Sequence, residues 1–255
     1  MQKQQIEQAA EMLLKARRSM QRITGLPESC RPLNVADAHA IQDATTTALG
    51  TDVHAFKAMA PANGEPTRGL IYEGTLFPSP ARIPAAMVPD CGVEGEVAFI
   101  FRRDLPPRER AYTREEVSVV VDALAAIEVV HSRYTDRTKV STLENLADSI
   151  SNGAFVYAAP LADWRGLRPG RLPVRLTVNG ETVVAQEGGH PTGDPLGVAV
   201  ALANMMRLQD GVRAGQFVTC GSFTGLRFLR PGDHCSISFD GIGTAELRFV
   251  PSGIG

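Results

Sequence analysis

The stretch CGVEGEVAFIFRRDLP (residues 91–106) alternates side chains with a period of two, which is the pattern of a β-strand. Val97 and the phenylalanines that follow it fall on one face of this strand, and Glu94 and Glu96 fall on the other. Gly95 between the two acids carries no side chain, which permits close approach of another part of the chain. The pattern predicts a strand with one apolar face and two carboxylates together on the opposite face.

Two carboxylates on one strand face lie roughly 7 Å apart and repel each other. A third, Glu128, stands in AAIEVVHS among apolar neighbours, where a bare charge is costly to bury. In one interpretation Glu94 and Glu96 face water and Glu128 pairs with an arginine. In the other, the three carboxylates converge on a divalent cation. Oxygen ligands without thiolates or clustered histidines favour Mg²⁺, Mn²⁺ or Ca²⁺ over zinc.

The composition narrows the class of protein. The chain has 255 residues, enough for one large domain or two small ones, and its net charge of −2 gives no electrostatic basis for binding nucleic acid or an anionic membrane. The N-terminal stretch is amphipathic and lacks the apolar core of a signal peptide, and no run approaches the roughly 20 apolar residues of a membrane helix. Four widely spaced cysteines form no CxxC pair. We expect a cytoplasmic protein without nucleic-acid or membrane partners.

Helical patterns dominate the first fifth of the chain. Apolar spacing predicts a helix over residues 4–23, and Asn34 is placed to cap a second helix that ends near Leu49. Further on, Thr113 begins a capping box followed by a helix, and Asp194 caps another helix that starts with proline.

Strand patterns dominate the rest. Strands are predicted at 93–101 and 126–130, and Asn179-Gly180 fits a type I′ turn between two alternating runs. Helices in front and a mixed, strand-rich body behind predict an α+β fold. We expect an N-terminal helical subdomain at residues 1–80 and a metal-binding catalytic domain at residues 81–255.

Six segments occur in an order that resembles a known family. The segments are GVEGEVAFIF (92–101), AAIEVVHSRYTD (125–136), LADSISNGAFVYA (146–158), GHPTGDPLGVAVALANMM (189–206), VRAGQFVTCGSFTG (212–225) and PGDHCSISFDGIGTAELRF (231–249). Together they resemble the fumarylacetoacetate hydrolase superfamily over roughly Phe56 to Phe249. The resemblance is strongest to the branch of 2-keto-4-pentenoate hydratases and 4-oxalocrotonate decarboxylases, enzymes of aromatic meta-cleavage pathways.

The resemblance implies a mixed β-roll body and a metal site. In this family the E-x-E pair and the later glutamate bind Mg²⁺ or Mn²⁺, which here implies Glu94, Glu96 and Glu128. Lys57 in HAFKAMAP matches a lysine that the family implicates in acid–base work. Near a metal-bound enolate we expect its pKa to be lowered, which lets it shuttle a proton. The alternative for Lys57 is a plain surface lysine. AMAPANG replaces the family's IGxTS directly after this lysine, which leaves the substrate side chain open.

The segment LADSISNG is similar to the ADNAS segment of the hydratases and decarboxylases, and it replaces the KGxDxFxPxGP pattern of the hydrolases. This difference disfavours carbon–carbon hydrolysis. Asp148 and Ser151 are candidate catalytic residues, and Ser149 is a candidate substrate-binding residue that orients a water or a carboxylate. The alternative is a polar turn before the next strand.

Three further residues are candidates for substrate binding. Ser222 and Thr224 in CGSFTG stand between glycines, where backbone N–H groups meet anionic oxygens. No GK[ST] follows, so the segment is not a P-loop. His190 in GGHPTGDPL resembles the family's GHP, which implies a position in the pocket wall.

These observations predict a metal-dependent hydratase that adds water to a 2-hydroxypenta-2,4-dienoate-type substrate and yields a 4-hydroxy-2-keto acid. One alternative is decarboxylation of a 2-oxo-3-enedioate, which needs a cation at the far end of the pocket; Arg68, Arg133 and Arg227 are candidates. Others are an acylpyruvate hydrolase and a non-catalytic partner subunit. We expect a homo-oligomer that associates with a pathway partner enzyme.

Overall fold

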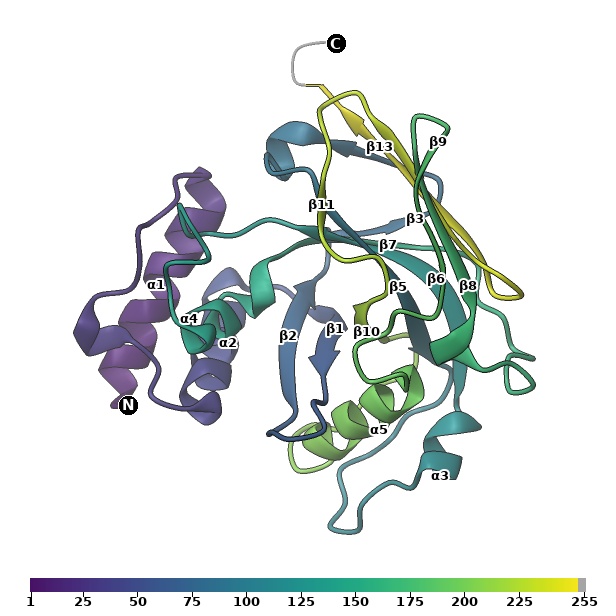
Figure 1. The fold of residues 1–255 in the computed structure, drawn as a ribbon. Coiled ribbons are helices and arrows are strands. Elements are labelled where there is room, and N and C mark those ends of the chain that lie inside the picture. The colour runs from purple at the N-terminus through teal and green to yellow at the C-terminus, as the bar shows by residue number, and fades with distance from the viewer. Residues whose placement is uncertain (252–255) are drawn as a thin grey trace.

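The computed structural model describes residues 1–251 and has two β-sheets with helices beside them (Figure 1). This arrangement confirms the α+β prediction. The helices are α1 (Lys3–Ser19), α2 (Val35–Leu49), α3 (Arg114–Ser118), α4 (Thr142–Ala147) and α5 (Pro195–Met206), with 3₁₀ turns at Glu28–Cys30, Ala85–Met87, Ser149–Ser151 and Pro169–Arg171. Among these residues, no helix combines the length and the hydropathy that crossing a bilayer requires.

The larger sheet carries eight strands in the order β2-β1-β10-β5-β6-β7-β3, with β11 paired to β5. Its strands are β1 (Val53–Met59), β2 (Thr67–Tyr72), β3 (Leu76–Pro78), β5 (Gly92–Phe101), β6 (Val121–Val130), β7 (Asn152–Tyr157), β10 (Phe217–Ser222) and β11 (Arg227–Phe228). Because β5 and β6 lie in the middle of the sheet and pair along ten residues each, they form a rigid platform for the side chains that they carry.

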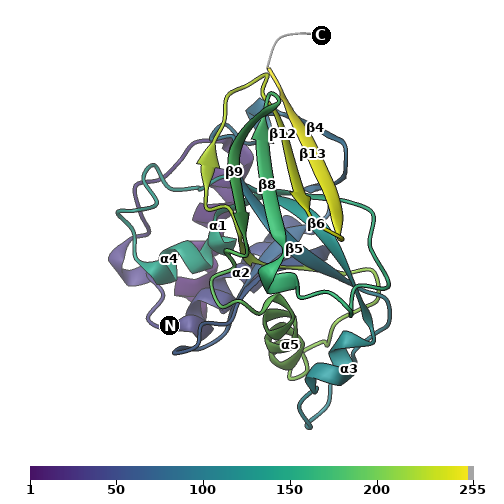
Figure 2. The same ribbon diagram turned by 45° about the vertical axis from the view of Figure 1, so that its right-hand side comes forward.

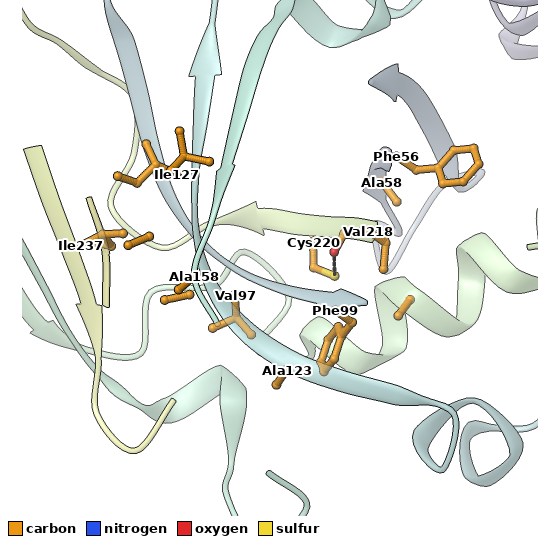
Figure 3. Packing of buried hydrophobic residues seen from close by; sticks show 14 of the residues in the cluster. Phe56, Ala58, Val97, Phe99, Ala123, Ile127, Ala158, Val218, Cys220 and Ile237 are labelled. Atoms are coloured by element: carbon orange, nitrogen blue, oxygen red, sulfur yellow. Dashed lines mark hydrogen bonds between the residues drawn. The ribbon is translucent and has the colours of Figure 1, made fainter. Parts of the chain in front are cut away.

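The smaller sheet has the order β4-β13-β12-β8-β9 and lies across β5 and β6 in Figure 2. Its strands are β4 (Ala81–Pro84), β8 (Pro173–Val178), β9 (Glu181–Glu187), β12 (His234–Phe239) and β13 (Gly243–Val250). The main hydrophobic core fills the space between the sheets, and Figure 3 shows Ile237 of β12 on the side that faces Val97 and Ile127. The predicted apolar face of the opening strand therefore packs against the second sheet.

The N-terminal helices form a smaller core of their own. Ala9 and Leu13 of α1 pack with Ile41 of α2 and with α4. Asn34 caps α2 as predicted, since its side chain accepts from the amide of Asp37. The helix predicted over residues 4–23 ends at Ser19, because Met20 turns into the left-handed region with φ 58°.

Two sequence expectations change in the structure. Thr113 forms the predicted capping box, but α3 ends at Ser118 and the chain enters β6 at Val121. The run of β-branched valines there fits a pleated sheet better than a helix. The helical part of the N-terminus also ends at Leu49, since β1, β2 and β3 belong to the larger sheet. The two-domain division at residue 80 stays a prediction, although it would separate β1, β2 and β3 from the other strands of the larger sheet.

Candidate metal centre and active site

Three carboxylates meet on one face of the larger sheet. β5 and β6 run antiparallel with Glu94 directly opposite Glu128, and the period of two puts Glu96 on the same face. One carboxylate oxygen from each residue lies within 4.8 Å of the other two. The side chains of Glu96 and Glu128 are fully buried, whereas that of Glu94 is 17% exposed. The strand register thus brings together all three predicted metal ligands, with Glu94 nearest to solvent.

Gly95 permits this arrangement from the opposite face. A Cβ atom built at Gly95 would lie 2.5 Å from Cδ1 of Ile237, on the strand β12 of the smaller sheet. The amide of Gly95 donates to the hydroxyl of Thr224 at 2.9 Å. The close approach predicted at Gly95 is therefore confirmed, and the part of the chain that approaches is the second sheet.

In each of the two buried carboxylates, one oxygen has donors from the protein and the other has none. Oε2 of Glu96 accepts from the hydroxyl of Thr219 and from the amide of Gly221, the latter at 2.7 Å. Oε1 of Glu128 lies 2.9 Å from Nζ of Lys57 and 3.4 Å from Nδ2 of Asn152. The second oxygens, Oε1 of Glu96 and Oε2 of Glu128, are buried and have no donor among residues 1–251. Oxygens left free in this way fit a hard divalent cation.

The charge balance at the site also favours a divalent cation. Burial raises the pKa of Glu96, and it raises the pKa of Glu128 to about 8, since the positive charge of Lys57 offsets only part of the cost. Repulsion from the neighbouring carboxylates adds to both shifts. One ammonium is too little positive charge for three clustered carboxylates, and a divalent cation would supply the rest.

Lys57 lies on β1 with its side chain buried against the acids. Its Nζ is 3.5 Å from Oε2 of Glu94 and 3.4 Å from the carbonyl of Ile150. Burial opposes the charged form, but Glu128, Glu94 and Glu96 outweigh it and raise the pKa of Lys57 above its ordinary value. This direction holds for the metal-free site, so the lowered pKa expected beside a metal-bound enolate stays a prediction. The surface-lysine alternative is wrong, because the side chain is buried.

The predicted catalytic residue Asp148 is engaged by a buried arginine. Both of its carboxylate oxygens accept from Arg133, one from the side chain and one from the backbone amide. The guanidinium also donates to the carbonyl oxygens of Asp148 and Asn152, at 3.0 and 2.8 Å. Arg133 thus holds both ends of the segment that passes Lys57. A catalytic role for Asp148 stays a prediction, and its observed contacts are with Arg133.

The segment between these ends is a left-handed turn. Ser149, Ile150 and Ser151 have φ values of 51°, 53° and 59°, a conformation that costs roughly 1–2 kcal/mol per residue. Gly69 of β2 packs directly on the turn, because a Cβ there would lie 2.7 Å from the carbonyl oxygen of Ser149. The turn presents the Ile150 carbonyl to Lys57. The roles predicted for Ser149 and Ser151 stay predictions.

The remaining candidates surround the end of β10. Ser222 is opposite Glu96 in register, and its buried hydroxyl has no partner among the described residues. The hydroxyl of Thr224 accepts from the amide of Gly95 and donates to the carbonyl of Gly225, so it ties this loop to β5. Nε2 of His190 lies 2.7 Å from the carbonyl oxygen of Cys220 and must donate to it. A substrate contact for each of these residues stays a prediction.

Sequence reasoning missed three residues that shape the site: Thr219, Asn152 and Arg133, which was considered only as a substrate cation. Thr219 and Asn152 each bond one buried carboxylate from a neighbouring strand. Thr219 and Asn152 are distant in sequence from Glu96 and Glu128, so no local sequence pattern predicts these contacts. The alternation in QFVTCGS was the one available signal for Thr219, because it puts this residue on a single strand face with Phe217.

Comparison with known proteins agrees with this geometry. Residues 55–250 match the family described as fumarylacetoacetate (FAA) hydrolase C-terminal. The 2-keto-4-pentenoate hydratase of Paraburkholderia xenovorans is 30% identical over 259 residues, covering 96% of this chain and 95% of that protein. A 4-oxalocrotonate decarboxylase of Pseudomonas putida is 26% identical and covers 66% of each chain.

Solved structures show the same fold. The 4-oxalocrotonate decarboxylase from Pseudomonas putida G7, complexed with magnesium and adipate, superposes with a TM-score of 0.84 at 20% identity and covers 98% of this chain and 99% of that one. A fumarylpyruvate hydrolase from Pseudomonas aeruginosa with Mn²⁺ and pyruvate gives a TM-score of 0.59 at 12% identity, covering 79% and 91%. With its matching sequence, fold and carboxylate cluster, the chain belongs to the fumarylacetoacetate hydrolase family.

Proposed function

We propose that the protein is a divalent-cation-dependent hydratase, a lyase that adds water to a 2-hydroxypenta-2,4-dienoate-type substrate in aromatic meta-cleavage catabolism. The observation that carries the proposal is the set of free carboxylate oxygens beside Lys57, in a chain 30% identical to a 2-keto-4-pentenoate hydratase over nearly its whole length. Mg²⁺ is the expected ion and Mn²⁺ the alternative, because all three ligands are hard oxygen donors.

The reaction needs one proton relocation and one addition of water. Glu94, Glu96 and Glu128 would hold the cation, which would act as a Lewis acid toward the substrate's carboxylate and enol oxygens. The dienol loses its hydroxyl proton and gains a proton at C5, which gives a ketone conjugated to the C3–C4 double bond. Water then adds its oxygen at C4 and a proton at C3. Lys57, with its Nζ 2.9 Å from Oε1 of Glu128, would assist this proton movement.

The decarboxylase alternative requires a cation for the substrate's second carboxylate. Arg68 is bonded to both carboxylate oxygens of Asp43, and Arg133 is bonded to Asp148. Arg227 is exposed on β11 and is opposite Val93, whose side chain belongs to the other face of β5. Because none of the three predicted arginines is an available cation on the carboxylate face, the contacts favour the hydratase.

The test is a steady-state assay of the purified protein with 2-hydroxypenta-2,4-dienoate and Mg²⁺. We expect loss of the dienol absorbance, formation of a 4-hydroxy-2-keto acid and inhibition by EDTA. Release of CO₂ from 2-oxohex-3-enedioate in place of hydration would make the decarboxylase the correct function. Wild-type activity in both Glu96→Gln and Lys57→Ala would overturn catalysis at this site, and a protein with neither activity that Mg²⁺ does not stabilise would be a non-catalytic subunit.

Self-association and association with a pathway partner enzyme are also proposed. β9 is an edge strand of the smaller sheet, and Val183 on it is 47% exposed. An unpaired edge of this kind is a template for pairing with another chain. Light scattering coupled to gel filtration measures the mass of the assembly, and a monomer at all concentrations would overturn self-association.

A further inference from the structure

The carboxamide of Asn152 has a defined orientation. Its Nδ2 faces two acceptors, Oε1 of Glu128 at 3.4 Å and the carbonyl of Ala154 at 3.5 Å. Rotating the amide by half a turn would bring Oδ1 against a carboxylate and a carbonyl, which places three acceptors together. The nitrogen must therefore face Glu128, and Oδ1 must point elsewhere.

The amide oxygen is then a buried acceptor without a donor. Asn152 is 1% exposed, and Oδ1 has no hydrogen-bond partner among residues 1–251. An unsatisfied buried acceptor of this kind costs about 1–3 kcal/mol and calls for an explanation. The backbone around it is fixed, since Arg133 bonds the Asn152 carbonyl at 2.8 Å.

Asn152 and Lys57 contact the same oxygen of Glu128. The oxygen that Asn152 shares is Oε1, which also contacts Nζ of Lys57 at 2.9 Å, whereas the oxygen left for a cation is Oε2. The amide of Asn152 and the ammonium of Lys57 are therefore neighbours at one carboxylate, within the cluster that would hold the cation. Ser222, with its own unpartnered hydroxyl, is opposite Glu96 across the same face.

We infer that Asn152 is a substrate-binding residue whose Oδ1 accepts a hydrogen bond from the C2 hydroxyl of a dienol substrate. The inference rests on the proposed hydratase function. An amide oxygen can only accept, so it bonds an enol O–H and opposes a ketone oxygen at the same position. Asn152 thereby favours binding of the 2-hydroxydienoate over the 2-keto form of the same acid. This preference makes the dienol the form that enters the site.

The test compares wild type with Asn152→Leu, which keeps the size of the side chain and removes the acceptor. We expect KM for 2-hydroxypenta-2,4-dienoate to rise about tenfold to a hundredfold, the cost of an unmatched buried hydrogen bond. The inhibition constant of pyruvate, a 2-keto acid without an enol hydroxyl in its stable form, should change less than threefold. The dissociation constant of Mg²⁺, measured by calorimetry, should change less than the KM of the dienol, because Oε1 of Glu128 loses only a 3.4 Å bond and keeps its 2.9 Å contact with Lys57. Asn152→Ala, which also removes the acceptor, repeats the comparison if the leucine variant does not fold.

Asn145→Leu is the matched control. Asn145 also has a buried oxygen without a partner, but its nitrogen bonds the carbonyls of Arg137 and Ser141, away from the carboxylates. It should keep the wild-type KM. An unchanged dienol KM in Asn152→Leu, or an equal loss of dienol and pyruvate binding, overturns the inference and leaves the hydratase function intact. A weakened Mg²⁺ affinity alone would make Asn152 a residue that positions Glu128 or binds the cation. If the wild type does not hydrate the dienol, the proposed function fails and the inference with it.

Discussion

The ammonium of Lys57 lies 2.9 Å from the carboxylate of Glu128, and both groups are buried on the same face of the larger sheet. Lys57→Met should lower kcat by about 10²–10⁴, the range of a lost general acid–base group. Mg²⁺ binding should persist or tighten, because a competing positive charge is gone. Stopped-flow assays and calorimetry measure the two effects. Lys139→Met removes an exposed lysine and should leave both unchanged; loss of Mg²⁺ binding in Lys57→Met would contradict this division of roles.

Thr219→Val should weaken Mg²⁺ binding through Glu96. The hydroxyl of Thr219 donates to Oε2 of Glu96 and thereby fixes the carboxylate with Oε1 free of protein donors. Loss of a bond that orients a ligand typically costs 10–100-fold in metal affinity. Calorimetric titration should show that loss in Thr219→Val and near-wild-type affinity in Thr219→Ser. Equal affinities in valine and serine variants would show that the hydroxyl does not position Glu96.

Gly95→Ala should destabilise the contact between the two sheets. The new Cβ would stand 2.5 Å from Cδ1 of Ile237, and overpacking of this kind costs about 1–3 kcal/mol. The measurement is urea unfolding of the metal-free protein. Gly166→Ala is the control, since a Cβ there meets nothing within 4 Å. If both variants unfold at the same urea concentration as wild type, the two sheets accommodate the added methyl group, and the predicted clash with Ile237 is wrong.

Acid should weaken the fold through His39. Its Nε2 accepts from the backbone amide of Arg68, and burial together with the nearby Arg68 charge lowers the pKa of His39 to about 4. The unfolded chain takes up a proton near pH 6.5 and the folded chain only near pH 4, so stability is lost as the pH falls through this window. The loss is on the order of 2–3 kcal/mol.

His39→Gln, which keeps an acceptor and does not titrate, should flatten the slope of the unfolding free energy between pH 6.5 and 4. His54→Gln changes an exposed histidine and should keep the wild-type slope. An identical slope in both variants would exclude His39 as the titrating group.

The sequence predicted well wherever the signal is local. Asn34, Thr113 and Asp194 cap helices as expected, because a cap contacts amides only three residues ahead. The turn at Asn179-Gly180 joins β8 and β9, with both residues at positive φ. Prediction failed between Ser118 and Val121, where pairing with β5 makes β6 a strand from its first residue.

By itself, the alternation in VEGEVAF determined that Glu94 and Glu96 share a face with Gly95 between them, since side-chain direction in a strand follows from covalent geometry. Only the tertiary structure decided what meets that face. The β5–β6 register sets Glu128 opposite Glu94, and the parallel pairing of β1 with β10 brings Lys57 into the large sheet. These contacts join residues far apart in the chain. Their free energies depend on how deeply each charge is buried, and burial is set by tertiary packing and not by the spacing of residues in the sequence.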